Sequence, residues 1–244
     1  MGQAKGLEIS YHGQTIRGSL AMAHVLATLQ HSNPTRIVAI LPESVMFSEL
    51  DKPGRAILDA LYHVEIEEQF KNSTFRGARV NSVLVAMDRL KTPRIKSLSS
   101  NAETLHSKIK IIRGGLPCFE ATETRKGLHF VHSTDIRRLV HGYPLSKLIK
   151  VSPFSRGVTS GHMVLLPRVG IPKEESIDAW YSERPIQLSD CVLALQFASA
   201  DAAEEGADSM RQNYQSLAQL YRGTGARYVT LERLSTWIDA SGIK

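Results

Sequence analysis

The chain has 244 residues, 42% of them hydrophobic, which is enough to bury one large core or two small ones. No apolar run approaches twenty residues and no charged segment leads into an apolar one, so we expect neither a membrane span nor a signal peptide. The two cysteines, Cys118 and Cys191, exclude a disulfide framework and suit a reducing, cytoplasmic compartment. His129 and His132 have no third ligand at a suitable spacing, so no metal site is expected.

Positive charge is concentrated in the middle of the chain. Residues 71–170 contain 18 Lys and Arg against five Asp and Glu, whereas the rest contains 12 against 19. A cluster of this kind favours a polyphosphate partner, because cations that contact phosphates release condensed counterions. The alternative is a solvated basic face with no partner.

The first ninety residues predict an α/β layer. We expect a loose lead-in over residues 1–11 and an amphipathic helix over residues 14–30, where apolar residues recur at helical spacing. Residues 36–42 are nearly all apolar and end in proline, which predicts a buried parallel strand. A helix opened by Pro53 follows, then a strand at residues 63–67, a basic loop at 70–79 and a strand at 80–87.

Three parts of this region resemble one family. Residues 37–44 (Ile-Val-Ala-Ile-Leu-Pro-Glu-Ser), 55–58 (Arg-Ala-Ile-Leu) and 75–85 (Phe-Arg-Gly-Ala-Arg-Val-Asn-Ser-Val-Leu-Val) are similar to the run that follows the catalytic tetrapeptide of adenine-N6 DNA methyltransferases of restriction-modification systems. The family's tetrapeptide, Asn/Asp-Pro-Pro-aromatic, and its glycine-rich S-adenosylmethionine loop are both absent here. The resemblance covers about residues 12–90. It implies that residues 1–95 form the distal half of a Rossmann-like catalytic domain, with no catalytic or cofactor-binding residues.

A polar stretch at residues 96–107 predicts a linker, and short strands follow at 108–112, 128–131, 162–166 and 188–197. A long helix is expected over residues 201–221, and Thr230 is placed to cap a last one. Residues 112–117 (Ile-Arg-Gly-Gly-Leu-Pro), 129–135, 164–170, 188–193 and the ending at 221–234 are similar to target-recognition domains of type I specificity subunits and fused methyltransferases. The resemblance implies an α+β, β-rich domain over residues 108–244 that reads base edges in DNA.

Phe75 stands five residues before Val80, where the methyltransferase family places an aromatic that stacks on a flipped adenine. The alternative is that Phe75 packs in the core. Arg76 and Arg79 flank it and are candidates to hold the DNA strand, although solvated charges would look the same.

In the second domain, five basic residues are candidates for DNA contact: Arg113, Arg125, Lys126, Arg156 and Arg168. Arginine pairs bidentately with guanine, which contributes about 1–3 kcal/mol of discrimination. Arg168 also lies in a motif that suggests a structural role. Arg137 and Arg138 follow Asp135 on a predicted helix and suit phosphate contact or solvent, and a structural role is favoured for Arg222 and Arg227.

Together these patterns predict the DNA-binding part of a site-specific adenine-N6 methyltransferase. Double-stranded DNA and an N-terminal methyltransferase half, or a subunit that carries it, are the expected partners. S-adenosylmethionine would serve the complete enzyme and would not bind this chain alone. A half-sheet leaves an open edge, so self-association is also expected. The alternative is a non-enzymatic DNA specificity module on a degenerate methyltransferase scaffold; a restriction endonuclease subunit is disfavoured because no nuclease-like Asp…Glu-x-Lys spacing is present.

Overall fold

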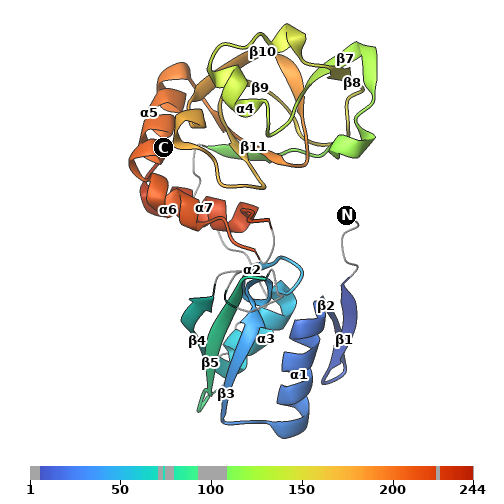
Figure 1. Cartoon of the computed structure of the whole chain (residues 1–244), viewed down its shortest axis with the longest axis vertical. Coiled ribbons are helices and arrows are strands. Elements are labelled where there is room, and N and C mark those ends of the chain that lie inside the picture. Colours follow the sequence, from blue (N-terminus) through green and yellow to red (C-terminus); the bar gives the residue numbers. More distant parts are fainter. Residues whose placement is uncertain (1–5, 71–73, 75–79, 93–108, 224–225, 244) are drawn as a thin grey trace. The chain divides into compact units, whose positions relative to one another are not determined.

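The computed structural model describes residues 6–70, 74, 80–92, 109–223 and 226–243. The fold is mixed α/β and divides into two compact units (Figure 1). Unit 1 comprises Met1–Ala102 with Arg222–Ala226, and unit 2 comprises Glu103–Tyr221 with Arg227–Lys244. The predicted linker at 96–107 lies outside the described residues.

Unit 1 consists of β1 (Leu7–Tyr11), β2 (Gln14–Gly18), α1 (Leu20–Ser32), β3 (Arg36–Pro42), α2 (Glu43–Phe47), α3 (Lys52–Leu61), β4 (Tyr62–Phe70) and β5 (Ser82–Arg89). β1 and β2 form an antiparallel hairpin whose turn residues, His12 and Gly13, both have positive φ. The predictions of a loose lead-in and of a helix from residue 14 were therefore wrong. The helix begins after Ser19, whose hydroxyl oxygen accepts a hydrogen bond from Met22 N.

The main sheet of unit 1 has the strand order β3-β5-β4, and β5 runs antiparallel to both neighbours. β3 and β4 are therefore parallel to each other, with β5 between them. The prediction of a buried strand within a parallel pair was wrong for β3: its neighbour is antiparallel, and burial alternates along it. β3 has a partner on one side only among the described residues, and Val38 and Ile40 are 58% and 53% exposed.

Helices α1 and α3 cover the face of this sheet opposite the one that carries Val38 and Ile40. Met22 and Leu26 of α1 and Leu58 of α3 are almost fully buried together with Val85 and Met87 of β5. Pro53 lies in the first turn of α3, where its missing N–H costs nothing. These contacts form one hydrophobic core for unit 1.

A short C-terminal segment completes unit 1. Arg222 donates to Gln69 Oε1 at 3.1 Å, and its guanidinium lies 3.8 Å from the carboxylate of Glu43. Asn81 Nδ2 donates to the carbonyl oxygen of Gly223 at 2.9 Å. Since the Glu43 side chain is only 8% exposed, Arg222 supplies its nearby counter-charge. A structural role for Arg222, favoured from the sequence, agrees with these contacts.

Unit 2 is built from β6 (Lys110–Arg113), β7 (Glu123–Val131), α4 (Ile136–Val140), β8 (Lys150–Val151), β9 (Val158–Pro167), β10 (Ala179–Leu188), β11 (Val192–Phe197), α5 (Ala200–Gln212), α6 (Tyr214–Gln219) and α7 (Leu231–Ser241), with short 3-10 turns η1 (Cys118–Glu120), η2 (Leu145–Lys147) and η3 (Glu174–Ser176). Its sheet has the order β6-β11-β9-β10-β7-β8, and only the β10–β7 pair is parallel.

Alternate residues of β9 and β11 point to two separate cores. Val164 and Leu166 of β9 pack with α5 and with Leu234 and Trp237 of α7. Met163 and Leu165, one residue out of phase, pack with α4 on the other face. Helices thus cover both faces of the sheet of unit 2 (Figure 1).

Several element boundaries in unit 2 differ from the predictions. β10 was missed because Pro185 and a register shift between Ser182 and Ile186 interrupt its pattern. The long helix predicted over residues 201–221 is two helices, which meet at Asn213. The predicted cap of the last helix is confirmed, since Thr230 accepts from Arg233 N at 3.2 Å.

Across the described residues, no helix combines the length and apolar character needed to cross a bilayer.

Candidate nucleic-acid interface

A small buried cluster joins five segments of unit 2. Leu116, Phe130 and Val151 form its centre, and Ala121 and Phe154 pack against it. These residues come from the turn after β6, from the residue that follows η1, from β7, from β8 and from the loop after β8. Segments that are far apart in the sequence therefore share one support, and four of the five have a cation within them or directly beside them. We call the following set the basic loop surface: Arg113, Arg125, Lys126, Lys150 and Arg156.

The turn that follows Arg113 adjoins the loop that carries Arg156. A Cβ atom on Gly115 would lie 2.3 Å from Cγ of Arg156, so only glycine allows the loops to approach this closely. Gln187 is fully buried and fixes the second loop: its Oε1 accepts from Phe154 N at 2.8 Å, and its Nε2 donates to Arg156 O at 3.0 Å. Arg113 and Arg156 are both exposed.

Arg125 and Lys126 lie in a bulge of β7. The register with β8 shifts between Glu123 and Leu128, both of which are opposite Val151. The extra residues of a bulge leave the ladder and re-aim their side chains. Arg125 and Lys126 are exposed, and Thr124 holds the bulge by donating to Lys126 O at 3.0 Å. The sequence did not single out Lys150, the half-buried cation of β8.

Arg168 has a different environment from the other four predicted contacts. Its Nε donates to the carbonyl oxygen of Asp190 at 2.7 Å. Its backbone joins the same turn, since Arg168 N donates to Cys191 O and Val229 N donates to Arg168 O. These contacts agree with the structural alternative for Arg168, and its contact with DNA stays a prediction.

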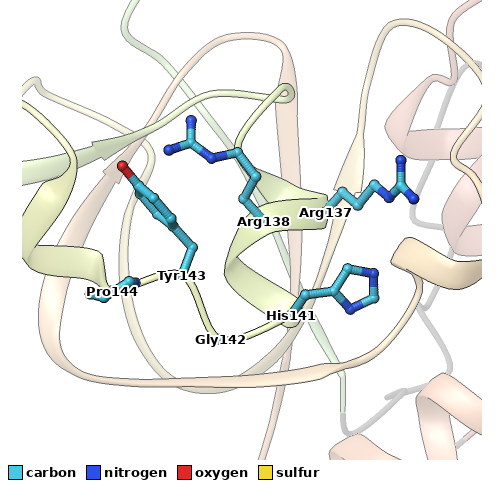
Figure 2. Close-up of a pocket in the computed structure, with 6 residues that line it drawn as sticks. All are labelled: Arg137, Arg138, His141, Gly142, Tyr143 and Pro144. Carbon is cyan, nitrogen blue, oxygen red and sulfur yellow. The ribbon is translucent and has the colours of Figure 1, made fainter.

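A second basic surface lies around α4. Figure 2 shows Arg138 extending toward the ring of Tyr143, while Arg137 and His141 point to the other side. The Arg138 guanidinium lies 3.7 Å from the ring centroid, and Lys147 Nζ lies 5.7 Å from it.

Both arginines of α4 also have acidic neighbours. Arg137 lies 3.6 Å from Glu175 and Arg138 lies 3.6 Å from Asp135. These carboxylates partly neutralise the basic surface around α4. The basic loop surface therefore suits a polyanion better than the surface around α4 does.

Three predicted site residues, Phe75, Arg76 and Arg79, lie outside the described residues. The histidines considered for metal binding are engaged elsewhere: the Nδ1 of His129 lies 3.3 Å from Leu148 O, and that of His132 lies 3.0 Å from Thr134 Oγ1. Within the described ranges, no three His, Cys, Asp or Glu side chains are grouped to hold a metal.

Two described helices of unit 1 that follow strands begin beside acidic side chains. Ser19, at the start of α1, donates its backbone N–H to Asp51 at 2.6 Å. The first turn of α2 contains the buried carboxylate of Glu43. Helices α1 and α2, which follow strands directly, thus each have a carboxylate of unit 1 at the N-terminus. A second negative charge, such as a ligand carboxylate, is disfavoured there.

Comparisons with known proteins leave the family open. No protein-family model matches the sequence, and no curated protein matches it significantly. Among solved structures, the chain is similar to a type I restriction-modification system S subunit from M. genitalium, with a TM-score of 0.32 and 9% identity. That match covers 52% of this chain and 30% of the other chain. A TM-score of this size does not identify a shared fold.

Proposed function

We propose that this chain is the DNA-binding part of a site-specific adenine-N6 DNA methyltransferase, in which unit 2 recognises the sequence and unit 1 is the distal half of the catalytic domain. The observation that carries the proposal is the basic loop surface. Its cations come from residues 113–156 and lie within or beside segments that pack on one buried cluster. Long cationic side chains on supported loops are suited to phosphates and to base edges.

The sheet of unit 1 supports the second part of the proposal. The predicted order of strand, helix, strand and strand is present as β3, α3, β4 and β5. Val38 and Ile40 are exposed on β3, one of the two edge strands of this sheet among the described residues. An edge strand of this kind is a template for another strand. We assign this edge and its apolar side chains to the missing methyltransferase half, which would carry the catalytic tetrapeptide and the S-adenosylmethionine loop.

DNA binding is tested by fluorescence anisotropy of labelled duplexes, titrated with the full chain at several salt concentrations. We expect binding at low ionic strength that weakens steeply with salt. The double variant Arg125→Ala/Lys126→Ala should flatten the plot of log K against log salt by roughly two units, because each lost phosphate contact contributes about 0.9.

The matched control for this titration is Lys173→Ala/Arg184→Ala. It also removes two exposed positive charges from unit 2, but neither residue belongs to the basic loop surface. If the two double variants weaken binding equally, binding is a matter of net charge and the assigned surface is wrong. If the unmodified chain does not bind duplexes even at low salt, the proposed function fails.

A complementation experiment separates the enzyme from the alternative, a DNA specificity module without activity. The chain is mixed with a polypeptide that carries the missing methyltransferase half, and adenine methylation of duplex DNA is followed with labelled S-adenosylmethionine. Methylation that requires both polypeptides is the expected result. DNA binding without methylation, in a complex shown to form, would favour the specificity module instead.

A further inference from the structure

Phe119 is exceptionally exposed for a large apolar side chain. It is 88% exposed in η1, whereas the next most exposed large apolar residue of the described chain, Leu20, is 61% exposed. Isolated apolar side chains at a surface are common. A phenyl ring in solvent to this degree, beside a basic surface, has a large contact area to offer a partner.

The segment that carries Phe119 is firmly anchored on both sides. Before it, Leu116 is buried and pairs with Ser189, and its carbonyl oxygen accepts from Asp190 N at 3.0 Å. After it, Ala121 packs on the small cluster that supports the basic loop surface. The 3-10 turn itself is closed by hydrogen bonds from Glu120 N to Pro117 O and from Ala121 N to Cys118 O, at 3.0 and 3.3 Å. The ring is thus presented by an ordered backbone, so little entropy is lost when it binds.

Charge identifies the kind of partner. Arg113 lies six residues before Phe119 and Arg125 six residues after it, and both belong to the basic loop surface. Gly115, in the same segment, adjoins Arg156. Glu120 and Glu123 are nearby in sequence, and Asp135 and Asp190 act electrostatically on the neighbouring Cys118, but the five cations of the surface outnumber these four carboxylates. An exposed ring on a segment that adjoins such a basic surface is complementary to stacked bases between two phosphate backbones.

We propose that Phe119 is a wedge that enters duplex DNA between two neighbouring base pairs and kinks the duplex there. This inference rests on the proposed function, because the cations of the basic loop surface must first hold the duplex. Burial of one phenyl ring and loss of one stacking step are of similar size. The wedge therefore changes the shape of the DNA more than its affinity, and it favours flexible pyrimidine–purine steps.

The test uses the full chain and duplexes enriched by it from a random-sequence pool. Enriched duplexes are labelled at both ends, and bending is measured by energy transfer. We expect the unmodified chain to increase the transfer. Phe119→Ala should bind within about tenfold of the same affinity but leave the duplex straight. Phe119→Leu, which keeps an apolar wedge, should retain part of the bend.

Ile171→Ala is the matched control, because Ile171 is another exposed apolar residue of unit 2 outside the basic loop surface; it should bend DNA like the unmodified chain. Equal bending by Phe119→Ala and the unmodified chain would overturn the wedge while leaving DNA binding intact. So would a loss of self-association in Phe119→Ala with no change in bending, since Phe119 would then be a protein contact. If no duplex is enriched, the proposed function itself fails and the wedge with it.

Discussion

The thiol of Cys191, in the turn between β10 and β11, is expected to react slowly with alkylating agents. Burial raises the pKa of its thiol from 9.0 to about 11, and the charge of Asp190 adds to the effect. Because the thiolate is the nucleophile, we expect alkylation of Cys191 by iodoacetamide to be slow at pH 8. The rate should rise about tenfold per pH unit until about pH 11. Asp190→Asn should lower the pKa and speed the reaction at pH 8; a rate that levels off near pH 9 in the unmodified chain would contradict this.

Arg222 is expected to stabilise unit 1. Arg222→Ala removes the cation next to the buried carboxylate of Glu43. We expect it to lower the free energy of unfolding of unit 1 by about 1–3 kcal/mol. Hydrogen exchange of the β5 amides measures this loss.

Arg222→Ala has two controls: a variant of the exposed Arg227, and the fluorescence of the two tryptophans. Arg227→Ala removes an exposed arginine of the same turn and should change little. Both tryptophans, Trp180 and Trp237, lie in unit 2, so their fluorescence follows that unit separately. Equal β5 exchange in the two variants would show that Arg222 does not stabilise unit 1.

At the scale of elements, strand β3 is expected to drive association. Lysine on an edge strand opposes strand addition, so Val38→Lys/Ile40→Lys should weaken self-association, and assembly with the missing half, by tenfold or more. This corresponds to about 1.4 kcal/mol, less than the burial of two aliphatic side chains provides. Sedimentation velocity measures the effect.

The control for the β3 variant is Glu65→Lys/Glu67→Lys, which places lysines on β4, at the other edge of the same sheet. It should leave association unchanged. An unmodified chain that stays monomeric at high concentration and also fails to assemble with the missing half would rule out the assigned role of β3.

At the scale of the whole molecule, the cofactor is expected to bind only to an assembled enzyme. Titration calorimetry of S-adenosylmethionine into this chain alone should give no saturable heat, because the described helix N-termini of unit 1 that follow strands face the chain's own carboxylates. Saturable binding should appear when the complementary half is added. Tight binding to the isolated chain would show that this division of roles is wrong.

Local patterns predicted individual elements well where one signal dominated. The apolar run ending in Pro42 gave a strand with the bounds found, and Thr230 marked the start of α7. The prediction failed where two patterns overlapped. Ile16 continues the helical spacing of α1 but lies in β2, because the hairpin turn at His12 and Gly13 pairs residues 14–18 with β1.

The candidate site was predictable only as a set of residue types. The sequence marked Arg113, Arg125, Lys126, Arg156 and Arg168 as candidates, with a structural alternative for Arg168. In the structure the first four lie within or beside segments that pack on one cluster, while the Arg168 side chain donates to a backbone carbonyl. Phe119 and Lys150 had no signal of their own, because exposure and cross-strand position are not properties of a residue and its neighbours in sequence.

What the sequence determined by itself was local: the concentration of positive charge in residues 71–170, the strand at residues 36–42 and the cap at Thr230. Each depends on residues that are near one another along the chain. Tertiary contacts place β5 antiparallel between β3 and β4, and they bring the turn after Arg113 against the loop of Arg156. Those outcomes depend on contacts between distant segments, whose free energy comes from shared cores such as Leu116, Phe130 and Val151 and not from local propensity.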